Sequence, residues 1–376
     1  MKVIFLTSGH DPFDDRIFFH MSASLIRHNH KVCIITSTEN KIDSCEGIKL
    51  NCFNGVRLKK RVKVFEFVNR IKEENPEVII CSESLAVYAS NKYKKEWNKR
   101  VKIIYDITEW YPSKKNLCAY NQINKGINLV KLLLFNVWVS RIVDGFIFGE
   151  YYKSRLYRFL FPRTPFIYIP YYPDLRYIDN LNPEINAEKL RLSYSGKLTD
   201  DKGFGNFTKL IDELSVLYPD LKIEVKIIGW PDVCEKNNSK AKMPQKKNVS
   251  VTYLNKLPYF EYLNTIRDTD IFFDLRKIDF ENSHSLPIKL FLYAAFGRPV
   301  IFSDLKAIRK AIDISRFGYL VNPSDLKEIS DIVHTYLTDE SKYLFQSSSA
   351  RKEIEEKYHW SIIEPEFIEF VLSLPK

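Results

Sequence analysis

Short apolar runs alternate with amphipathic stretches along the first 170 residues. The amphipathic stretches place apolar residues at helical spacing, as at Ile17, Met21 and Leu25, whereas the runs have the length and residue types of buried strands. Six runs in this part of the chain fit strands: KVIFLTS, KVCIITST, EVIICSES, VKIIYDIT, GFIFGE and FIYIPYY. Strands that alternate with helices predict a parallel sheet with crossover helices, the doubly wound α/β class.

The same pattern starts again after the proline-rich segment 170–174. The further runs that fit strands are RLSYSG, LKIEVKIIGW, VSVTYL, DIFFDL and PVIFSD. A length of 376 residues also favours two domains. We therefore expect one domain over residues 1–172 and a second domain from residue 173, joined by this linker. Residues 235–248 carry charges without a pattern and fit a solvated loop.

The chain is basic, with a formal net charge of +10. This charge favours an anionic partner: a phosphorylated small molecule, an acidic membrane surface or a nucleic acid. The sequence has no zinc-finger spacing and no RNA-recognition signature, so we do not expect a nucleic-acid partner. Cys33 and Cys81 lie in expected strands and no C-x-x-C occurs, which favours buried free thiols in a reducing compartment. The first residues form too short an apolar run for a signal peptide, so we expect a cytoplasmic protein.

The most apolar stretch covers residues 127–148, but it contains Lys131, Asn136, Arg141 and Asp144 and makes a poor membrane span. Two interpretations remain for this stretch and for the basic segments of the first domain. They form an amphipathic surface that rests on the inner face of the cell membrane, or they are buried core helices with a solvated basic rim. The basic segments are residues 57–63, 92–100 and 151–163.

In open parallel sheets, ligands bind beyond the carboxyl ends of the strands, so the loops at those ends are the candidate sites. The loop after the first strand holds Gly9, His10, Asp14 and Arg16. Gly9 lets a phosphate approach the backbone closely. The alternative is an ordinary helix start, with Asp14 or Asp15 as the N-cap and Arg16 as a surface charge.

The strand that ends at YDITEWYP places Asp106, Thr108 and Glu109 in a similar loop. Their side chains could bind sugar hydroxyls or cap the next helix.

The loop SGKLTDDKG in the second half carries Lys197 and Lys202, bracketed by Gly196 and Gly203. Two ammonium groups near a helix start form a binding site for a diphosphate. Two solvated lysines are the alternative.

Residues 283–304 predict a helix that runs into a strand. Ser283 or Ser285 is placed to cap the helix, and Pro287 falls in its first turn, where the missing N–H costs little. Free N–H groups near Ser285 and Leu286 would then face the same anion. Because this helix is apolar nearly all round, we expect other elements to cover both of its sides.

Together these motifs resemble the family 4 glycosyltransferases, which are retaining enzymes of the GT-B fold. The resemblance covers nearly the whole chain, and its second-half motifs are the more specific. The matching positions are His10, Pro12, Asp14, Arg16, Ile17 and Phe18; Gly196–Leu198 with Lys202 and Gly203; Ser285–Pro287, Lys289–Phe291, Tyr293, Ala295, Gly297 and Pro299–Ile301; and Asp304 and Trp360.

The resemblance implies two Rossmann-like domains that face a cleft. A C-terminal helix at residues 359–376 crosses back to the first domain and leaves residues 173–358 as the second. It also implies a UDP- or GDP-linked sugar as donor, with no cofactor and no bound metal, and a glycan or polyprenyl-linked acceptor. Bacterial surface polysaccharide synthesis is the setting that we expect.

The resemblance also implies roles for individual residues. Expected at the donor diphosphate are Gly9, Lys197, Lys202, Ser285, Leu286 and Lys289. Expected around the base and ribose are Leu254, Lys256, Leu257 and Leu292. Expected at the donor sugar are Thr108, Glu109, Glu281 and His284. Expected on the acceptor side are His10, Asp14 and Arg16. Asp14 and Glu109 are the candidate catalytic carboxylates.

Two positions depart from the family pattern. Leu292 stands where the family carries a glutamate that holds the ribose hydroxyls, and Thr108 replaces a histidine near the donor sugar. Three explanations stay open: Glu281, His284 or backbone groups hold the ribose, the donor differs from the usual ones, or the protein is a non-catalytic nucleotide-sugar binder or partner subunit. Another GT-B activity, such as a sugar-nucleotide epimerase, is a further alternative.

Overall fold

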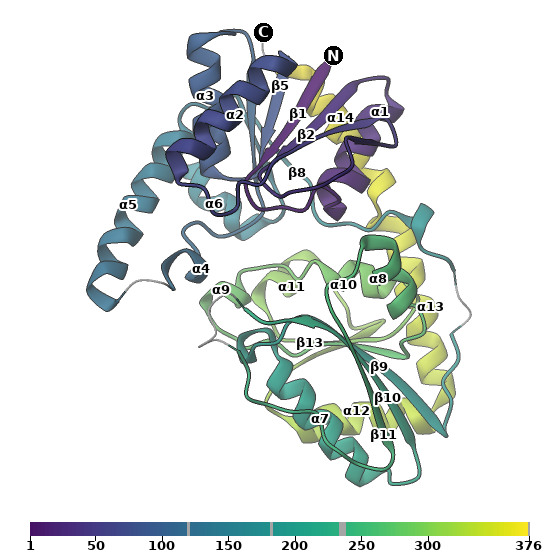
Figure 1. Ribbon diagram of the computed structural model, residues 1–376. Helices are drawn as coiled ribbons and strands as arrows, with labels where there is room; N and C mark the ends of the chain where they lie inside the picture. The colour runs from purple at the N-terminus through teal and green to yellow at the C-terminus, as the bar shows by residue number, and fades with distance from the viewer. Residues whose placement is uncertain (119–120, 181–182, 233–237, 375–376) are drawn as a thin grey trace. The chain divides into compact units, whose positions relative to one another are not determined.

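The computed structural model describes residues 1–118, 121–180, 183–232 and 238–374 (Figure 1). Contacts between Cα atoms divide the chain into two compact units. Unit 1 comprises Met1–Tyr171 and Trp360–Lys376, and unit 2 comprises Tyr172–His359.

Unit 1 is built on a sheet of eight strands in the order β3-β4-β2-β1-β5-β6-β7-β8. Every neighbouring pair is parallel except β3 with β4. The central strands are buried on both faces, which explains why their sequences are continuously apolar. The strands are β1 (Lys2–Thr7), β2 (Lys31–Thr36), β3 (Ser44–Cys45), β4 (Ile48–Cys52), β5 (Val78–Cys81), β6 (Lys102–Ile107), β7 (Gly145–Phe148) and β8 (Phe166–Tyr168).

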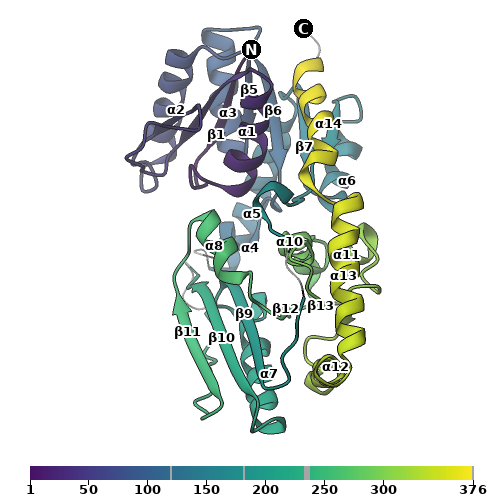
Figure 2. The ribbon, with the colours of Figure 1, turned by 90° about the vertical axis from the view of Figure 1, so that its right-hand side faces the viewer.

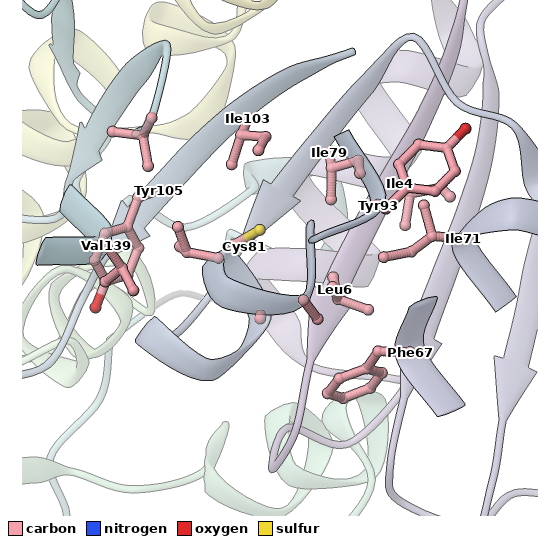
Figure 3. Packing of buried hydrophobic residues seen from close by; sticks show 14 of the residues in the cluster. Ile4, Leu6, Phe67, Ile71, Ile79, Cys81, Tyr93, Ile103, Tyr105 and Val139 are labelled. Carbon is pink, nitrogen blue, oxygen red and sulfur yellow. The ribbon is translucent and has the colours of Figure 1, made fainter. Parts of the chain in front are cut away.

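Helices pack on the sheet of unit 1. Figure 3 shows side chains of β1, β5 and β6, among them Ile4, Ile79 and Ile103, in one core with Phe67 and Ile71 of α2. The helices are the π-helical η1 (Asp15–Ser22), α1 (Ala23–Arg27), α2 (Lys60–Glu74), α3 (Ser84–Glu96), α4 (Lys114–Leu117), α5 (Gln122–Ser140), α6 (Tyr151–Leu160) and α14 (Trp360–Ser373).

Unit 2 has six strands, all parallel, in the order β11-β10-β9-β12-β13-β14. Figure 2 shows β11, β10 and β9 next to one another. The strands are β9 (Lys189–Lys197), β10 (Lys222–Trp230), β11 (Val249–Leu254), β12 (Ile271–Asp274), β13 (Val300–Ser303) and β14 (Gly318–Val321). The helices are η2 (Leu175–Tyr177), η3 (Asp200–Lys202), α7 (Phe204–Leu217), α8 (Tyr259–Ile266), α9 (Phe280–Ser283), α10 (Lys289–Ala295), α11 (Lys306–Ala311), α12 (Leu326–Thr338) and α13 (Glu340–Lys357). Two parallel α/β units confirm the predicted fold class.

The segment 283–304 differs in detail from its prediction. Helix α10 begins at Lys289, its N-cap is Ile288, and no side chain caps it, so the expected caps at Ser283 and Ser285 are wrong. The reason is Pro287, which disfavours helical geometry at the residue before it and so delays the start of the helix. The expected burial of the helix is correct, because α10 contributes Leu290, Phe291, Tyr293, Ala294 and Ala295 to one core cluster.

Two smaller expectations can also be compared with the structure. Cys33 and Cys81 are buried and free, as predicted. Over the described residues, no helix combines the length and the apolar character that crossing a membrane requires.

Helix α14 packs on unit 1, as predicted for the C-terminal helix, and Trp360 is its anchor. The indole is almost fully buried, donates a hydrogen bond from Nε1 to Ser24 Oγ at 2.8 Å, and lies 5.0 Å from the ring of His20. The end of the chain is therefore part of the core of unit 1.

We predict that Trp360→Ala lowers the free energy of unfolding of unit 1 by about 3–5 kcal/mol, because it leaves a large cavity and an unpaired Ser24 hydroxyl. Ile362→Ala is the control, since Ile362 lies on the same helix and is 41% exposed. It should cost under about 1 kcal/mol. Urea unfolding followed by circular dichroism measures the free energy of unfolding of both variants. If Trp360→Ala lowers it by no more than Ile362→Ala does, the anchoring role of Trp360 is contradicted.

Candidate functional site

Four cationic side chains gather where β9 and β12 end in unit 2. Lys197 is the last residue of β9, Lys202 ends η3, Arg276 follows β12 and Lys289 opens α10. The charges of Arg276 and Lys202 both act on Lys289, and all three act on Asp274, so these groups lie close together. The structure thus brings together two of the predicted diphosphate ligands, Lys202 and Lys289, and adds Arg276, which the sequence analysis missed.

Arg276 and Asp274 form a buried ion pair. Arg276 Nε donates to Asp274 Oδ1 at 2.7 Å, and a second hydrogen bond joins Nη2 to Oδ2. Burial raises the pKa of Asp274, but Arg276, Lys289 and Lys202 outweigh this effect and keep its pKa below the usual range. Asp274 is already bonded to Arg276, and Asp201 Oδ2 lies 3.7 Å from Lys202 Nζ, so these two carboxylates compensate the three cations only in part.

Lys289 is the most perturbed of these cations. Its Nζ donates to the carbonyl oxygen of Ser195, and a Cβ atom built on Gly196 would lie 3.5 Å from that Nζ. Gly196 has a φ of +133°, which side-chain-bearing residues rarely adopt. Burial, opposed by Asp274 and reinforced by Arg276 and Lys202, lowers the pKa of Lys289 to about 8. An anion at this point would restore the full charge of the lysine.

Lys202 is held by the turn that precedes α7. Its Nζ donates to Asn282 Oδ1 at 3.0 Å, and Asn282 Nδ2 donates in turn to the carbonyl oxygens of Asp201 and Lys277. Gly203 has a φ of +83°, and a Cβ there would come within 2.3 Å of the Leu275 backbone. The glycine therefore allows the chain to bring Lys202 next to the loop after β12. Burial lowers the pKa of Lys202, and Arg276 adds to this effect.

The other predicted diphosphate ligands are less clearly placed. Lys197 Nζ lies 3.2 Å from Asp232 Oδ2 in an ion pair. The N–H of Ser285, which was expected to be free, donates to Asn282 O at 3.1 Å and closes α9. Leu286 packs its side chain at the edge of the apolar cluster around α10. Gly9 belongs to unit 1, and a Cβ there would meet no atom within 4 Å, so its surroundings are open.

The residues expected around the base and ribose share one apolar surface. Leu254, Leu257 and Leu292 are partly buried and pack against the same cluster of unit 2, whereas Lys256 is exposed. Leu292 lies three residues after Lys289 on α10, a spacing that puts both on one side of the helix. The residue on the same side of α10 as Lys289 is therefore Leu292, whose side chain is a hydrocarbon rather than a carboxylate.

Of the residues expected at the donor sugar, Glu281 and His284 lie in and just after the short helix α9. The charge of Glu281 acts on Lys202. His284 Nδ1 lies 2.8 Å from Phe280 O, and the two rings are 4.6 Å apart. Thr108 and Glu109 follow β6 in unit 1.

A second polar group lies at the strand ends of unit 1. His10 Nδ1 lies 3.0 Å from Asp14 Oδ2, and Asp14 also caps η1 by accepting from the N–H groups of Arg16 and Ile17. Burial lowers the pKa of His10, but Asp14, Glu83 and Glu109 outweigh it and raise the pKa to about 9. The imidazole is therefore a cation among carboxylates at neutral pH.

Glu83, which the sequence analysis missed, joins this group from the loop after β5. Its Oε2 accepts from Thr7 Oγ1 at 3.3 Å, and burial raises its pKa. Carboxyl, imidazole and hydroxyl groups in such an array can bind a polyhydroxylated ligand. Among the described residues, no group of three or more His, Cys, Asp or Glu side chains is arranged to hold a metal ion.

Arg16 is not the surface charge that one interpretation of the sequence expected. It is almost fully buried and donates to both oxygens of Asp106 at 2.8 Å and to Ile169 O at 2.6 Å. Its guanidinium also lies 4.8 Å from the centre of the Tyr171 ring. Arg16 therefore ties η1 to β6 and to the end of unit 1.

No protein-family model matches the sequence, and a search of the curated proteins finds no relative. Solved structures do match. Sucrose-phosphate synthase from Thermosynechococcus elongatus superposes with a TM-score of 0.70 at 15% identity, covering 100% of this chain and 99% of its own. HepE from Anabaena, in complex with UDP-glucose, gives a TM-score of 0.70 at 13% identity and covers 100% of both chains. An α-glucosyltransferase in complex with UDP-glucose and DNA gives a TM-score of 0.65 at 12% identity and covers 99% of this chain and 100% of its own. The chain thus has the GT-B fold of these glycosyltransferases along its full length.

Proposed function

We propose that the protein is a retaining glycosyltransferase of family 4 type that transfers a sugar from a UDP- or GDP-linked donor. The cluster of Lys202, Arg276 and Lys289 carries this proposal, and Lys197 ends β9 at the same edge of the sheet. Parallel sheets bind ligands at the carboxyl ends of their strands, and a nucleoside diphosphate has the charge that this cluster lacks. Proteins of the same fold with bound UDP-glucose support the choice of donor.

The chemistry follows from the charge of the leaving group. When the bond between sugar and diphosphate breaks, negative charge grows on the diphosphate oxygens. Fixed ammonium groups at Lys202 and Lys289 stabilise that charge without a metal ion, and no cofactor is required. Asp14 and Glu109 remain the candidate catalytic carboxylates of unit 1, with His10 beside them for the acceptor.

The acceptor in this proposal is a glycan or a polyprenyl-linked glycan. A cytoplasmic enzyme at the inner face of the cell membrane, working in bacterial surface polysaccharide synthesis, would meet both donor and acceptor. The basic surface of unit 1 supports this setting.

One observation favours a second candidate, a nucleotide-sugar binder without catalysis or a partner subunit of an active transferase. Leu292 packs into the apolar cluster with Leu254 and Leu257, so no carboxylate stands at that position of α10 to hold a ribose. Loss of one hydrogen-bonding carboxylate costs roughly 1–3 kcal/mol of binding, which weakens a donor site without abolishing it. We therefore retain the enzyme as the main proposal.

We predict that one class among UDP-, GDP-, CMP- and dTDP-sugars raises the thermal unfolding temperature of the protein. Saturation at a hundredfold excess over Kd adds about 2.7 kcal/mol of stability. Lys202→Ala should weaken binding of that nucleotide about tenfold or more, because a charge-assisted contact is lost. Lys209→Ala, at an exposed lysine of α7, is the control and should leave binding unchanged.

The same panel separates the two candidate functions. Release of free nucleoside diphosphate from the stabilising donor, slowed by Lys202→Ala, supports the enzyme. Binding without release in the presence of glycan and polyprenyl-phosphate acceptors supports the binder, and no stabilisation by any donor contradicts both.

The affinity for UDP should fall as the pH rises through the pKa of Lys289, which is about 8. The charged lysine is the form that binds the diphosphate, and this form is lost above the pKa. Between pH 7 and pH 9 the loss should be about tenfold. Titration calorimetry measures it, with Lys289→Arg as the matched variant, because arginine stays charged over this range. A pH dependence that is the same in Lys289→Arg would assign the titration to another group.

Leu292 should make the site indifferent to the ribose 2′-hydroxyl. We expect UDP and dUDP to bind with affinities that agree within about twofold, whereas Leu292→Glu should favour UDP by about 5–150-fold. Leu292→Met is the apolar control and should show no preference. If the unaltered protein already prefers UDP strongly, another group, such as Glu281, His284 or the backbone, holds the ribose.

A further inference from the structure

The first half of α5 exposes apolar side chains on a charged protein. Ile127, Val130 and Leu134 are 49%, 55% and 64% exposed, and Leu133 is also exposed. In Figure 1 the beginning of α5 extends beyond the start of α3. A contiguous apolar surface of this kind marks an interaction site.

The second half of α5 shows that this exposure is not a packing failure. Asn136 is buried, and its Oδ1 accepts from Ser84 Oγ of α3 at 2.8 Å, while its Nδ2 donates to Tyr157 OH of α6 at 2.7 Å. Phe135 and Trp138 pack against Tyr88 of α3. The helix is therefore anchored at its end, and its start is held away from the core.

Four of the exposed residues follow helical spacing. Ile127, Val130, Leu134 and Trp138 lie on one stripe of α5, beside Lys131, whereas Leu129 and Leu133 are exposed outside it. Because this stripe is exposed, the interpretation of α5 as a buried core helix is wrong for its first half.

Helix α6, which contacts α5 through Tyr157, also exposes apolar side chains. Phe159 is 82% exposed, and Leu156 and Leu160 are also exposed. Arg155 comes before Leu156, Arg158 lies between Leu156 and Phe159, and the Arg158 guanidinium sits 4.7 Å from the Phe166 ring. We give the name docking face to seven of the exposed apolar residues of the two helices: Ile127, Val130, Leu133, Leu134, Leu156, Phe159 and Leu160.

The segments that carry the docking face have charges of one sign. The sequence contains no Asp or Glu from residue 110 to 143, nor from 151 to 173, whereas Lys125, Lys131, Arg141, Arg155 and Arg158 all fall within these ranges. Lysine and arginine carry long aliphatic stems, so their charged ends can reach a polar boundary while the stems stay among apolar groups.

We propose that the docking face inserts into the surface of a bilayer that contains anionic lipid. Apolar side chains enter the boundary between headgroups and acyl chains, and the flanking cations bind the acidic headgroups. A second copy of the chain fits less well, because a symmetric interface would place the cations of one copy against those of the other. The proposal does not depend on the donor site in unit 2.

The test is co-sedimentation of the full chain with vesicles of neutral phosphatidylcholine and with vesicles that also contain phosphatidylglycerol. We expect binding to the anionic vesicles, weakened by salt. Val130→Gln with Leu134→Gln should reduce this binding about tenfold or more, since two inserted side chains are lost. Glutamine keeps the helix propensity, so the variant should retain its circular dichroism.

Val216→Gln with Leu217→Gln is the matched control, because these residues of α7 in unit 2 are 63% and 54% exposed. The control should bind vesicles as the unaltered protein does. Three results would overturn the proposal: binding that survives in the α5 variant, equal binding to neutral vesicles, or self-association in solution that the α5 variant abolishes without any binding to vesicles. The last result would assign the face to a second copy.

Discussion

Repulsion among like charges at the ends of β9 and β12 is the constraint on which the rest of the candidate site depends. Lys202, Lys289 and Arg276 are close enough to perturb one another, and Asp274 is their buried counter-charge. Burial lowers the pKa of both lysines, and the neighbouring cations add to this effect. An anion bound among these groups would favour their charged forms.

The fold tolerates this repulsion because nearby groups hold the cations in place, among them Asp201, whose Oδ2 lies 3.7 Å from Lys202 Nζ. Lys289 rests on the Ser195 carbonyl and Lys202 on Asn282, which is itself fixed by two backbone carbonyls. Gly196 and Gly203 make these contacts geometrically accessible, since a side chain at either position would crowd Lys289 or the Leu275 backbone. The glycines are thus part of the electrostatic arrangement, although they carry no charge.

The sequence predicted the parts of this protein that depend on local patterns. Apolar runs and helical spacing gave two α/β units, and the spacing of Lys197, Lys202 and the glycines pointed to the end of β9 as the candidate site. What it missed are a contact between distant residues and the burial of a local ion pair. Arg16 and Asp106, which form an ion pair, are 90 residues apart in the sequence. The sequence D-x-R at Asp274 and Arg276 is common on protein surfaces, and only the structure shows that this pair is buried. The apolar pattern around Pro287 predicts an earlier start for α10 than Lys289, because this pattern does not reflect the restriction that Pro287 imposes on the residue before it.

Positive charge serves three physically different purposes in this chain, and its total of +10 cannot distinguish them. Arg16 is buried and fully paired with Asp106, so it contributes to structure and cannot serve a ligand. Lys202 and Lys289 are crowded and only partly compensated, so they favour an anion. The cations along α5 and α6 flank exposed apolar residues, so they favour a partner surface that is both anionic and apolar. Burial and the nearest counter-charge, rather than the number of basic residues, therefore decide what each cation can do.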